Sequence, residues 1–157
     1  MANQSVSEAM NKTTHGVYVI GVHTAEQDDL ATEAWMCQFS GSPAMVAVAV
    51  SSGHLTAELV RKAGKFTVSI LKDSQKDEAI ACGSVSGRKE DKTKKVDCAY
   101  TKSGIPYLKN SIAVLTCKVA DINDRFNHVM FFAEVEDAVM LSPDANPLEY
   151  HAKEFFG

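Results

Sequence analysis

The sequence predicts a mainly β domain, in which about six to seven short strands form a barrel beside two or three short helices. Two observations lead to this class. Short runs rich in β-branched and aromatic residues recur along the 157 residues, and clusters of Gly, Pro, Ser and Asn separate them. Only two segments carry clear helix start and stop signals. Strands therefore outnumber helices too heavily for a βαβ array, which excludes a Rossmann domain.

Three strands are predicted in the first third of the chain, at 15–22, 31–39 and 45–50. The first contains Val, Tyr and Ile and has glycines near both ends, and the second can continue the barrel. The third is the run Met45-Val-Ala-Val-Ala-Val50, which lies between Gly41-Ser-Pro43 and Ser51-Ser-Gly53. Its shortness and β-branched content indicate a buried strand and not a helix.

A helix is predicted at 56–63, because Thr56 precedes good helix formers as an N-cap and Gly64 follows the last turn. Residues 65–71 alternate as a strand does, and residues 74–81 indicate a second capped helix. A loop at 83–95 comes next. Strands at 111–119 and 128–141, joined by the polar residues 121–127, complete the expected barrel.

Composition sets the class of protein and its surroundings. With 45% hydrophobic and 23% charged residues, residues 1–157 are expected to form one globular domain. The net charge of −4 argues against nucleic acid as a partner. The first ten residues lack the features of a signal peptide, and the longest apolar run, 44–50, is far shorter than the roughly 20 residues of a membrane span. We therefore expect a cytoplasmic protein without a membrane partner.

The cysteines and histidines indicate neither a metal site nor a redox disulfide. The four cysteines, at 37, 82, 98 and 117, form no CxxC pair, so we expect reduced and mostly buried thiols. The five histidines make no HxxxH or HExxH arrangement, and no GxSxG elbow is present. We predict no metal and no covalent hydrolytic chemistry.

Two segments are suited to an anion. The turn 51–54 leads to a helix start at Thr56, where free N–H groups and the helix dipole favour phosphate. Residues 88–95 hold five cations against two carboxylates in an otherwise acidic chain. Each feature also has an ordinary explanation, since a strand, turn and helix often occur without a ligand and most charged runs are solvated loops.

Four motifs resemble those of a known family. Thr32-x-x-Trp35-x-x-Gln38-x-Ser40 ahead of a Val/Ala strand resembles the signature of the flavin reductase-like FMN-binding split barrels, which include the flavoredoxins. Ser86-Gly-Arg88 with Asp91-Lys92 is similar to the family's second motif. Asn127-His128 ahead of Glu134-Val135, and Pro147-Leu148-x-Tyr150, agree in order and spacing. The resemblance spans nearly the whole chain and implies a Greek-key split β-barrel, FMN as cofactor and a homodimer.

The resemblance also implies a set of site residues. Non-covalent FMN would be bound by Thr32, Ala34, Trp35, Met36, Cys37, Gln38, Ser51, Ser52, His54, Thr56, Ser86, Gly87, Arg88 and Lys92. The family often has Lys or Arg in the turn at 51–54, where this chain has none, so Arg88 or Lys92 would have to neutralise the phosphate. His128 is the catalytic candidate, as a proton donor or a contact for nicotinamide. Alternatively, Trp35 is simple core and His128 a structural histidine.

The implied function is that of an NAD(P)H-dependent flavin reductase, an oxidoreductase enzyme that passes electrons from nicotinamide through FMN to a flavin or protein acceptor. Without a GxGxxG motif, the nicotinamide would have to dock directly against the flavin and leave before the acceptor enters. The main alternative is a flavoredoxin-like electron-transfer protein without nicotinamide activity. A third is a split barrel that has lost flavin and binds a small ligand or haem.

Overall fold

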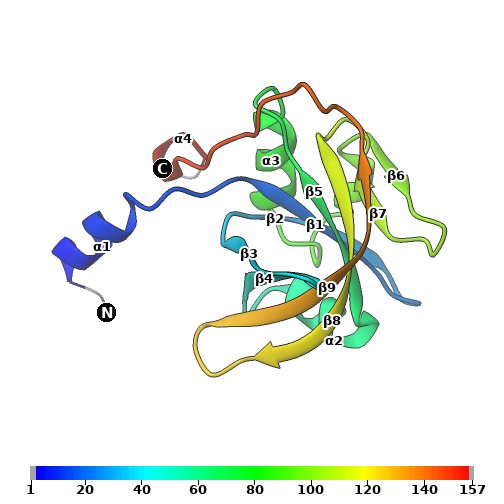
Figure 1. Cartoon of the computed structure of the whole chain (residues 1–157), viewed down its shortest axis with the longest axis horizontal. Helices are drawn as coiled ribbons and strands as arrows, with labels where there is room; N and C mark the ends of the chain where they lie inside the picture. The colour runs from blue at the N-terminus through cyan, green and yellow to red at the C-terminus, as the bar shows by residue number, and fades with distance from the viewer. Residues whose placement is uncertain (1–2, 156–157) are drawn as a thin grey trace.

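The computed structural model describes residues 3–155, and in it seven strands form one antiparallel sheet in the order β2-β1-β5-β8-β9-β4-β3. The sheet curls around an apolar interior (Figure 1). Its strands are β1 (Tyr18–His23), β2 (Asp28–Glu33), β3 (Met36–Gly41), β4 (Ala44–Ser51), β5 (Lys65–Ile70), β8 (Ala113–Asn123) and β9 (His128–Met140). The predicted mainly β class is therefore confirmed.

The barrel is split between β2 and β3. These strands are the two edges of the sheet, and in residues 3–155 no ladder pairs them, although only Ala34 and Trp35 separate them in sequence. A backbone hydrogen bond from the Ala49 N–H to the Trp35 carbonyl, 2.9 Å long, ties this short connection to β4. The single strand predicted at 31–39 is thus wrong.

Two helices cover the sheet. In α2 (Leu55–Ala63) the N-cap is His54 and not the predicted Thr56, because the Thr56 hydroxyl is turned inward to Asp29. Gly64 ends α2 with φ +70°, the left-handed conformation that glycine adopts at least cost. α3 (Lys76–Gly83) begins two residues later than predicted, and a short 3₁₀ helix, η1 (Lys92–Lys94), lies within the predicted loop 83–95.

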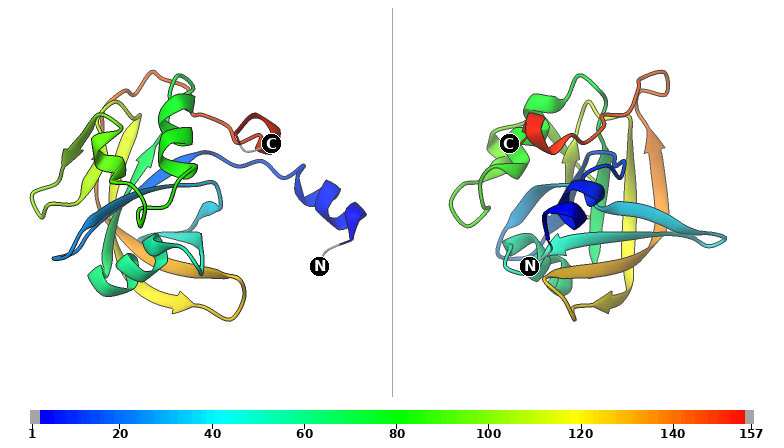
Figure 2. Two further views of the ribbon diagram at one scale, coloured as in Figure 1. Left: turned by 180° about the vertical axis from the view of Figure 1, so that it is seen from behind. Right: turned by 90° about the vertical axis from the view of Figure 1, so that its left-hand side faces the viewer.

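Four further elements in the described part of the chain lie outside the predicted ones. α1 (Gln4–Met10) has no buried residue and projects away from the barrel (Figure 2). A small hairpin forms from β6 (Cys98–Tyr100) and β7 (Pro106–Leu108). α4 (Ala152–Phe155) lies near the end of the described chain. None of the helices in residues 3–155 is both long and apolar enough to cross a membrane.

The core has two clusters. One fills the barrel, where Phe66 and Phe131 are fully buried against Leu59 of α2. The other lies outside the barrel, where Leu30 of β2 packs with Ala79 of α3. β2 therefore faces α3 on one side and α2 on the other, and its end is the place where both layers meet.

Candidate functional site

Two cavities adjoin at the end of β2. The larger has a volume of about 510 Å³ and is lined by the segment 10–15, by the β2–β3 connection, by His128 and by Tyr150. The smaller, of about 190 Å³, lies between β2, the N-terminus of α2, the 83–87 loop and Lys92. Thr32 and Glu33 line both cavities. A ligand with a broad head and a narrow polar tail would fit this pair.

The smaller cavity has the features of an anion site. The N-cap residue His54 makes no side-chain hydrogen bond to the first turn of α2, and Leu55 and Thr56 of that turn line the cavity. Uncapped N–H groups and the helix dipole attract negative charge there. On the opposite wall, a Cβ at Gly87 would lie 2.5 Å from Asp29 Oδ1 and 3.1 Å from Leu55, so only glycine allows the loop to approach this closely.

A buried ion pair forms the floor of the smaller cavity. Lys92 Nζ lies 3.2 Å from Asp29 Oδ1 and donates a 3.3 Å hydrogen bond to the carbonyl of Cys82. The Thr56 hydroxyl donates to Asp29 Oδ2 at 2.7 Å. The Lys92 charge is therefore balanced by Asp29, which differs from the expected role of Lys92 as a free cation for phosphate.

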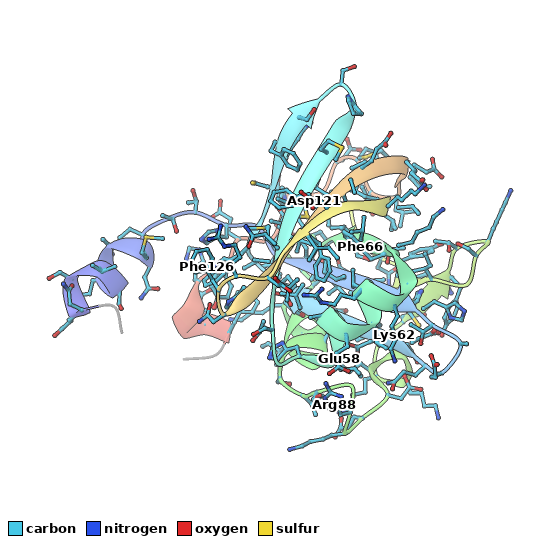
Figure 3. The ribbon with its side chains drawn as sticks, turned by 90° about the horizontal axis from the view of Figure 1, so that it is seen from below. Glu58, Lys62, Phe66, Arg88, Asp121 and Phe126 are labelled. Atoms are coloured by element: carbon cyan, nitrogen blue, oxygen red, sulfur yellow. The ribbon has the colours of Figure 1, made fainter. Side chains whose placement is uncertain are left out.

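Arg88 also has a carboxylate partner. Its guanidinium donates to Glu58 Oε1 at 2.6 Å, and both side chains lie at the surface beside α2 (Figure 3). Arg88 is not part of the lining of either cavity. Neutralisation of a phosphate in the smaller cavity consequently rests on backbone N–H groups unless Arg88 leaves Glu58.

An aromatic pair stands at the larger cavity. The rings of Trp35 and His128 are 4.7 Å apart between centroids and tilted by 39°. Trp35 is 51% exposed, so the interpretation of this residue as simple core is wrong. The indole instead offers a flat surface to the cavity on which a planar ring can pack.

His128 is neutral in this setting. Partial burial and, to a smaller extent, the nearby His54 lower the pKa of His128 below its ordinary value. Its Nδ1 is 2.9 Å from Oδ1 of Asn127, and an amide oxygen can only accept, so Nδ1 carries the hydrogen. In this neutral tautomer Nε2 is a hydrogen-bond acceptor, and the ring donates a proton from Nε2 only after it has been protonated.

Glu33 is a site residue that sequence reasoning missed. Burial raises the pKa of its carboxyl to about 8, against the opposing effect of Lys92. At neutral pH the side chain is mostly protonated and able to donate a hydrogen bond. Its one sequence signal is the spacing of four from Asp29, because residues four apart on a strand point to the same side.

The structure brings together many of the predicted residues. Around the larger cavity are Thr32, Ala34, Trp35 and His128, and around the smaller are Thr32, His54, Thr56, Ser86, Gly87 and Lys92. Outside both linings are Met36, Cys37, Gln38, Ser51, Ser52 and Arg88. Cys37 and Gln38 are exposed on the edge strand β3, whereas Cys82 and Cys117 are buried as expected. The binding roles themselves stay predictions.

Several hydroxyls already donate within the protein. Thr32 donates to the Ala79 carbonyl at 2.5 Å, and Ser52 donates to the Asn127 carbonyl at 3.0 Å. Toward a ligand these oxygens are therefore available as acceptors. The remaining lining residues that sequence reasoning missed are Met10, Asn11, Thr13, His15 and Tyr150 on the larger cavity, and Asp29, Ala31, Leu55 and residues 82–85 on the smaller.

Residues 10–157 match the family model described as "Flavin reductase like domain". Among curated relatives, the reductase component of 4-nitrophenol 4-monooxygenase/4-nitrocatechol 2-monooxygenase from Rhodococcus opacus is 30% identical over 152 residues, which cover 95% of this chain and 79% of the relative. The high molecular weight rubredoxin of Moorella thermoacetica is 25% identical over 92% of this chain, which spans only 63% of that protein. A relative from Archaeoglobus fulgidus is 29% identical over 73% of this chain, and the matched residues span 66% of that relative's length.

Solved structures agree in fold. An FMN-binding protein from Thermus thermophilus superposes with a TM-score of 0.83 at 24% identity, covering 93% of this chain and 86% of that one. The NADH:FAD oxidoreductase SgcE6 of Streptomyces globisporus superposes with a TM-score of 0.86 at 20% identity, covering 96% and 92%. At these identities the likeness establishes the split barrel and leaves ligand and activity to other arguments.

Proposed function

The chain belongs to the flavin reductase like domain family, and on that premise we propose that it is an oxidoreductase that binds FMN non-covalently. In this proposal NADH or NADPH reduces the flavin, and a free flavin or a protein partner takes the electrons. The Rhodococcus relative is itself named as the reductase component of a monooxygenase. We also propose that residues 1–157 form a single domain and that the protein acts in the cytoplasm.

The observation that carries the proposal is the pair of adjoining cavities at the split of the barrel. The small one offers the N-terminus of a nine-residue helix, and the large one offers the exposed face of Trp35. FMN has the complementary parts, a phosphate at one end and a planar aromatic ring at the other. Thr32 and Glu33, which line both cavities, would then face the linking ribityl chain.

The residues present fit this cofactor with one limitation. N–H groups of the first turn of α2 and the loop at Ser86-Gly87 would receive the phosphate. Little positive charge is available there to neutralise the phosphate, because Lys92 is already paired with Asp29. We therefore expect FMN to bind reversibly and with a moderate dependence on salt.

When bound, the flavin supplies the ability to accept a hydride and release electrons in one or two steps. The chain's own residues orient it and shape access to its ring. Trp35 limits one side of the larger cavity, and the neutral His128 stacked on it can accept a hydrogen bond from a nicotinamide amide at Nε2. A volume of about 510 Å³ leaves room for one planar partner beside the flavin at a time.

Anaerobic mixing with NADH and with NADPH tests the proposal directly. The protein is first loaded with FMN and freed of excess, and loss of the yellow absorbance is followed by stopped flow. Rapid bleaching by either nucleotide, faster than that of free FMN at equal concentration, is the expected result. If the oxidised spectrum persists with both, the reductase assignment fails and the flavoredoxin-like alternative takes its place. A protein that retains no FMN would overturn both.

We also propose that the chain forms a homodimer. Trp35 and Phe39 are each about half exposed on the split side of the barrel, and Phe39 packs edge-on against Phe132 at 5.5 Å. Such exposed aromatic side chains are typical of surfaces that become buried on association. Light scattering after size-exclusion chromatography gives the mass, and a monomer at micromolar concentration contradicts this part of the proposal.

A further inference from the structure

Glu33 stands where the two cavities meet, and the proposed function places it near the ribityl chain without using its ionisation. It is the last residue of β2 and lines both cavities. Asp29, four residues earlier on the same strand, lines the smaller cavity as well. One side of β2 thus presents two carboxyl groups to a space that is otherwise built for an anion.

The charges around this space do not balance. Of the described residues that line the two cavities, Lys92 is the one lysine or arginine. Its ammonium group is 3.2 Å from Asp29 and bonded to the Cys82 carbonyl, so Asp29 takes up its charge. An ionised Glu33 would therefore add an uncompensated negative charge beside the proposed phosphate position.

We propose that Glu33 must be protonated when a phosphorylated flavin binds, because the neutral carboxyl admits the anion and the carboxylate repels it. Binding then takes up a proton wherever Glu33 of the free protein is ionised. This inference rests on the proposed function insofar as FMN is the ligand. The neutral carboxyl can donate its hydroxyl to a ribityl oxygen, whereas the ionised form has no hydrogen to donate. Glu33 would thus act as a specificity-determining residue between the two cavities.

The protonation of free Glu33 agrees with this role. Burial raises the pKa of Glu33 to about 8, so at pH 7 the neutral form prevails before any ligand arrives. A phosphate nearby raises this pKa further through like-charge repulsion. Affinity is then independent of pH below the pKa of the free protein and falls above it, as one proton must be recovered for each ligand bound.

Other titratable groups lie on the elements around this space. Tyr18 of β1 lies opposite Glu33 in the sheet, Cys82 and Glu78 belong to α3, and His54 stands at the start of α2. Burial raises the pKa of Cys82 to about 12 and also raises that of Tyr18, so both stay neutral through the range of interest.

On the larger cavity, His15, His128 and Tyr150 are titratable neighbours. Burial lowers the pKa of His128, which favours the uncharged ring. All of these groups remain in a Glu33→Gln variant. Any pH dependence that survives in that variant belongs to them, and the difference from wild type isolates Glu33.

The experiment measures FMN affinity between about pH 7 and 9, where the phosphate is already a dianion. Titrations follow the quenching of FMN fluorescence for wild type, for Glu33→Gln and for Glu134→Gln, which removes an exposed carboxyl on β9. The wild-type and Glu134→Gln Kd should be constant below pH 8 and then rise toward about tenfold per pH unit. Glu33→Gln should give a flat profile, and riboflavin, which keeps the ribityl chain but lacks the phosphate, should show a weaker pH dependence than FMN with the wild type.

Calorimetry of the wild type alone provides an independent reading if the variant folds poorly. Titration near pH 8 in two buffers of different ionisation enthalpy should reveal uptake of about half a proton per FMN. No proton uptake, or equal pH profiles for wild type and Glu33→Gln, overturns the role of Glu33 and leaves the proposed function intact. Failure of FMN to bind at any pH overturns the proposed function itself.

Discussion

The ammonium group of Lys92 lies 3.2 Å from Asp29 Oδ1, and both side chains are almost completely buried, with 3% and 1% of their surface exposed. Asp29 comes from β2 and Lys92 from η1, while Thr56 adds a hydrogen bond from α2. The pair therefore holds three elements together at the base of the smaller cavity. We therefore expect this ion pair to contribute more to the stability of the fold than to ligand binding.

Lys92→Met should lower the free energy of unfolding by about 3 kcal/mol or more, because it leaves the Asp29 carboxylate buried without its cation. The double variant Asp29→Asn with Lys92→Met should recover part of that loss. Urea denaturation measures both, with Lys94→Met as the control on an exposed lysine of the same 3₁₀ helix. Equal stability of the two lysine variants would contradict the structural role of the pair.

Arg88 and Glu58 form an exposed ion pair that FMN binding should disturb. If Arg88 turns to the phosphate, Arg88→Ala weakens FMN affinity by about tenfold and Glu58→Gln strengthens it by freeing the guanidinium. Both changes should alter protein stability by less than about 1 kcal/mol, as is usual for surface pairs. FMN titrations at low and high salt measure the contribution of the Arg88 charge to binding. Unchanged affinity in both variants shows that Arg88 stays with Glu58.

Trp35 is the only tryptophan of the chain, so its fluorescence reports on the larger cavity without interference. Addition of FMN should quench this emission, because the flavin ring would pack against the indole. Trp35→Ala should weaken FMN binding by about tenfold, the usual effect of losing one stacking partner. Its effect on stability should be small, since the side chain is half exposed. Emission that is unchanged at saturating FMN would place the flavin elsewhere.

His128→Gln should slow the reduction of bound FMN by NADH or NADPH by at least about tenfold while FMN affinity stays nearly constant. The reason is the position of His128 at the larger cavity, stacked on Trp35 and turned by Asn127. His23→Gln is the control, since His23 pairs with Asp28 away from both cavities. Stopped-flow bleaching gives the rates, and equal rates in the two variants remove His128 from the catalytic role.

Gly21→Ala should be among the most disruptive small substitutions in the sheet. A Cβ at this position of β1 would collide with the carbonyl oxygen of Pro106, a backbone atom that cannot easily move. We expect a loss of about 3 kcal/mol in unfolding free energy, as for strong overpacking. Gly53→Ala, where a Cβ would meet no atom within 4 Å, should change stability by less than about 0.5 kcal/mol. Denaturant midpoints of the two variants decide the matter.

The parts of the fold that follow from local pattern were predictable. β4 was expected at 45–50 and spans Ala44–Ser51, and Gly64 ends α2 in the left-handed conformation its position indicated. The break at Ala34 was not predictable, because residues 31–39 contain no turn residue. The chain bends there only because β2 and β3 pair with different strands at opposite edges of the sheet. The short β6–β7 hairpin has too few residues for any periodicity to appear.

The site residues were predictable where a sequence motif contains them. They were not predictable where a contact between distant parts of the chain determines which way a side chain points. Thr32, Trp35 and His128 were expected near one another and line the same cavity. Among the five cations of residues 88–95, however, nothing in the sequence distinguishes Lys92 as the one that turns inward. That choice depends on Asp29, more than sixty residues away. Glu33 was missed because burial determines its protonation, and no sequence pattern shows that burial.

The absence of a ladder between β2 and β3 separates the residues that maintain the fold from those that shape the cavities. The core clusters around Phe66 and Leu30 join the sheet to the helices packed on it, whereas Ala34, Trp35 and the 83–87 loop border the opening. Substitutions at exposed positions of the opening, such as Trp35, should cost little stability, so ligand preference can change on a constant barrel, whereas Gly87 is fixed by its approach to Asp29. Directed evolution for new acceptors should accordingly begin at this rim.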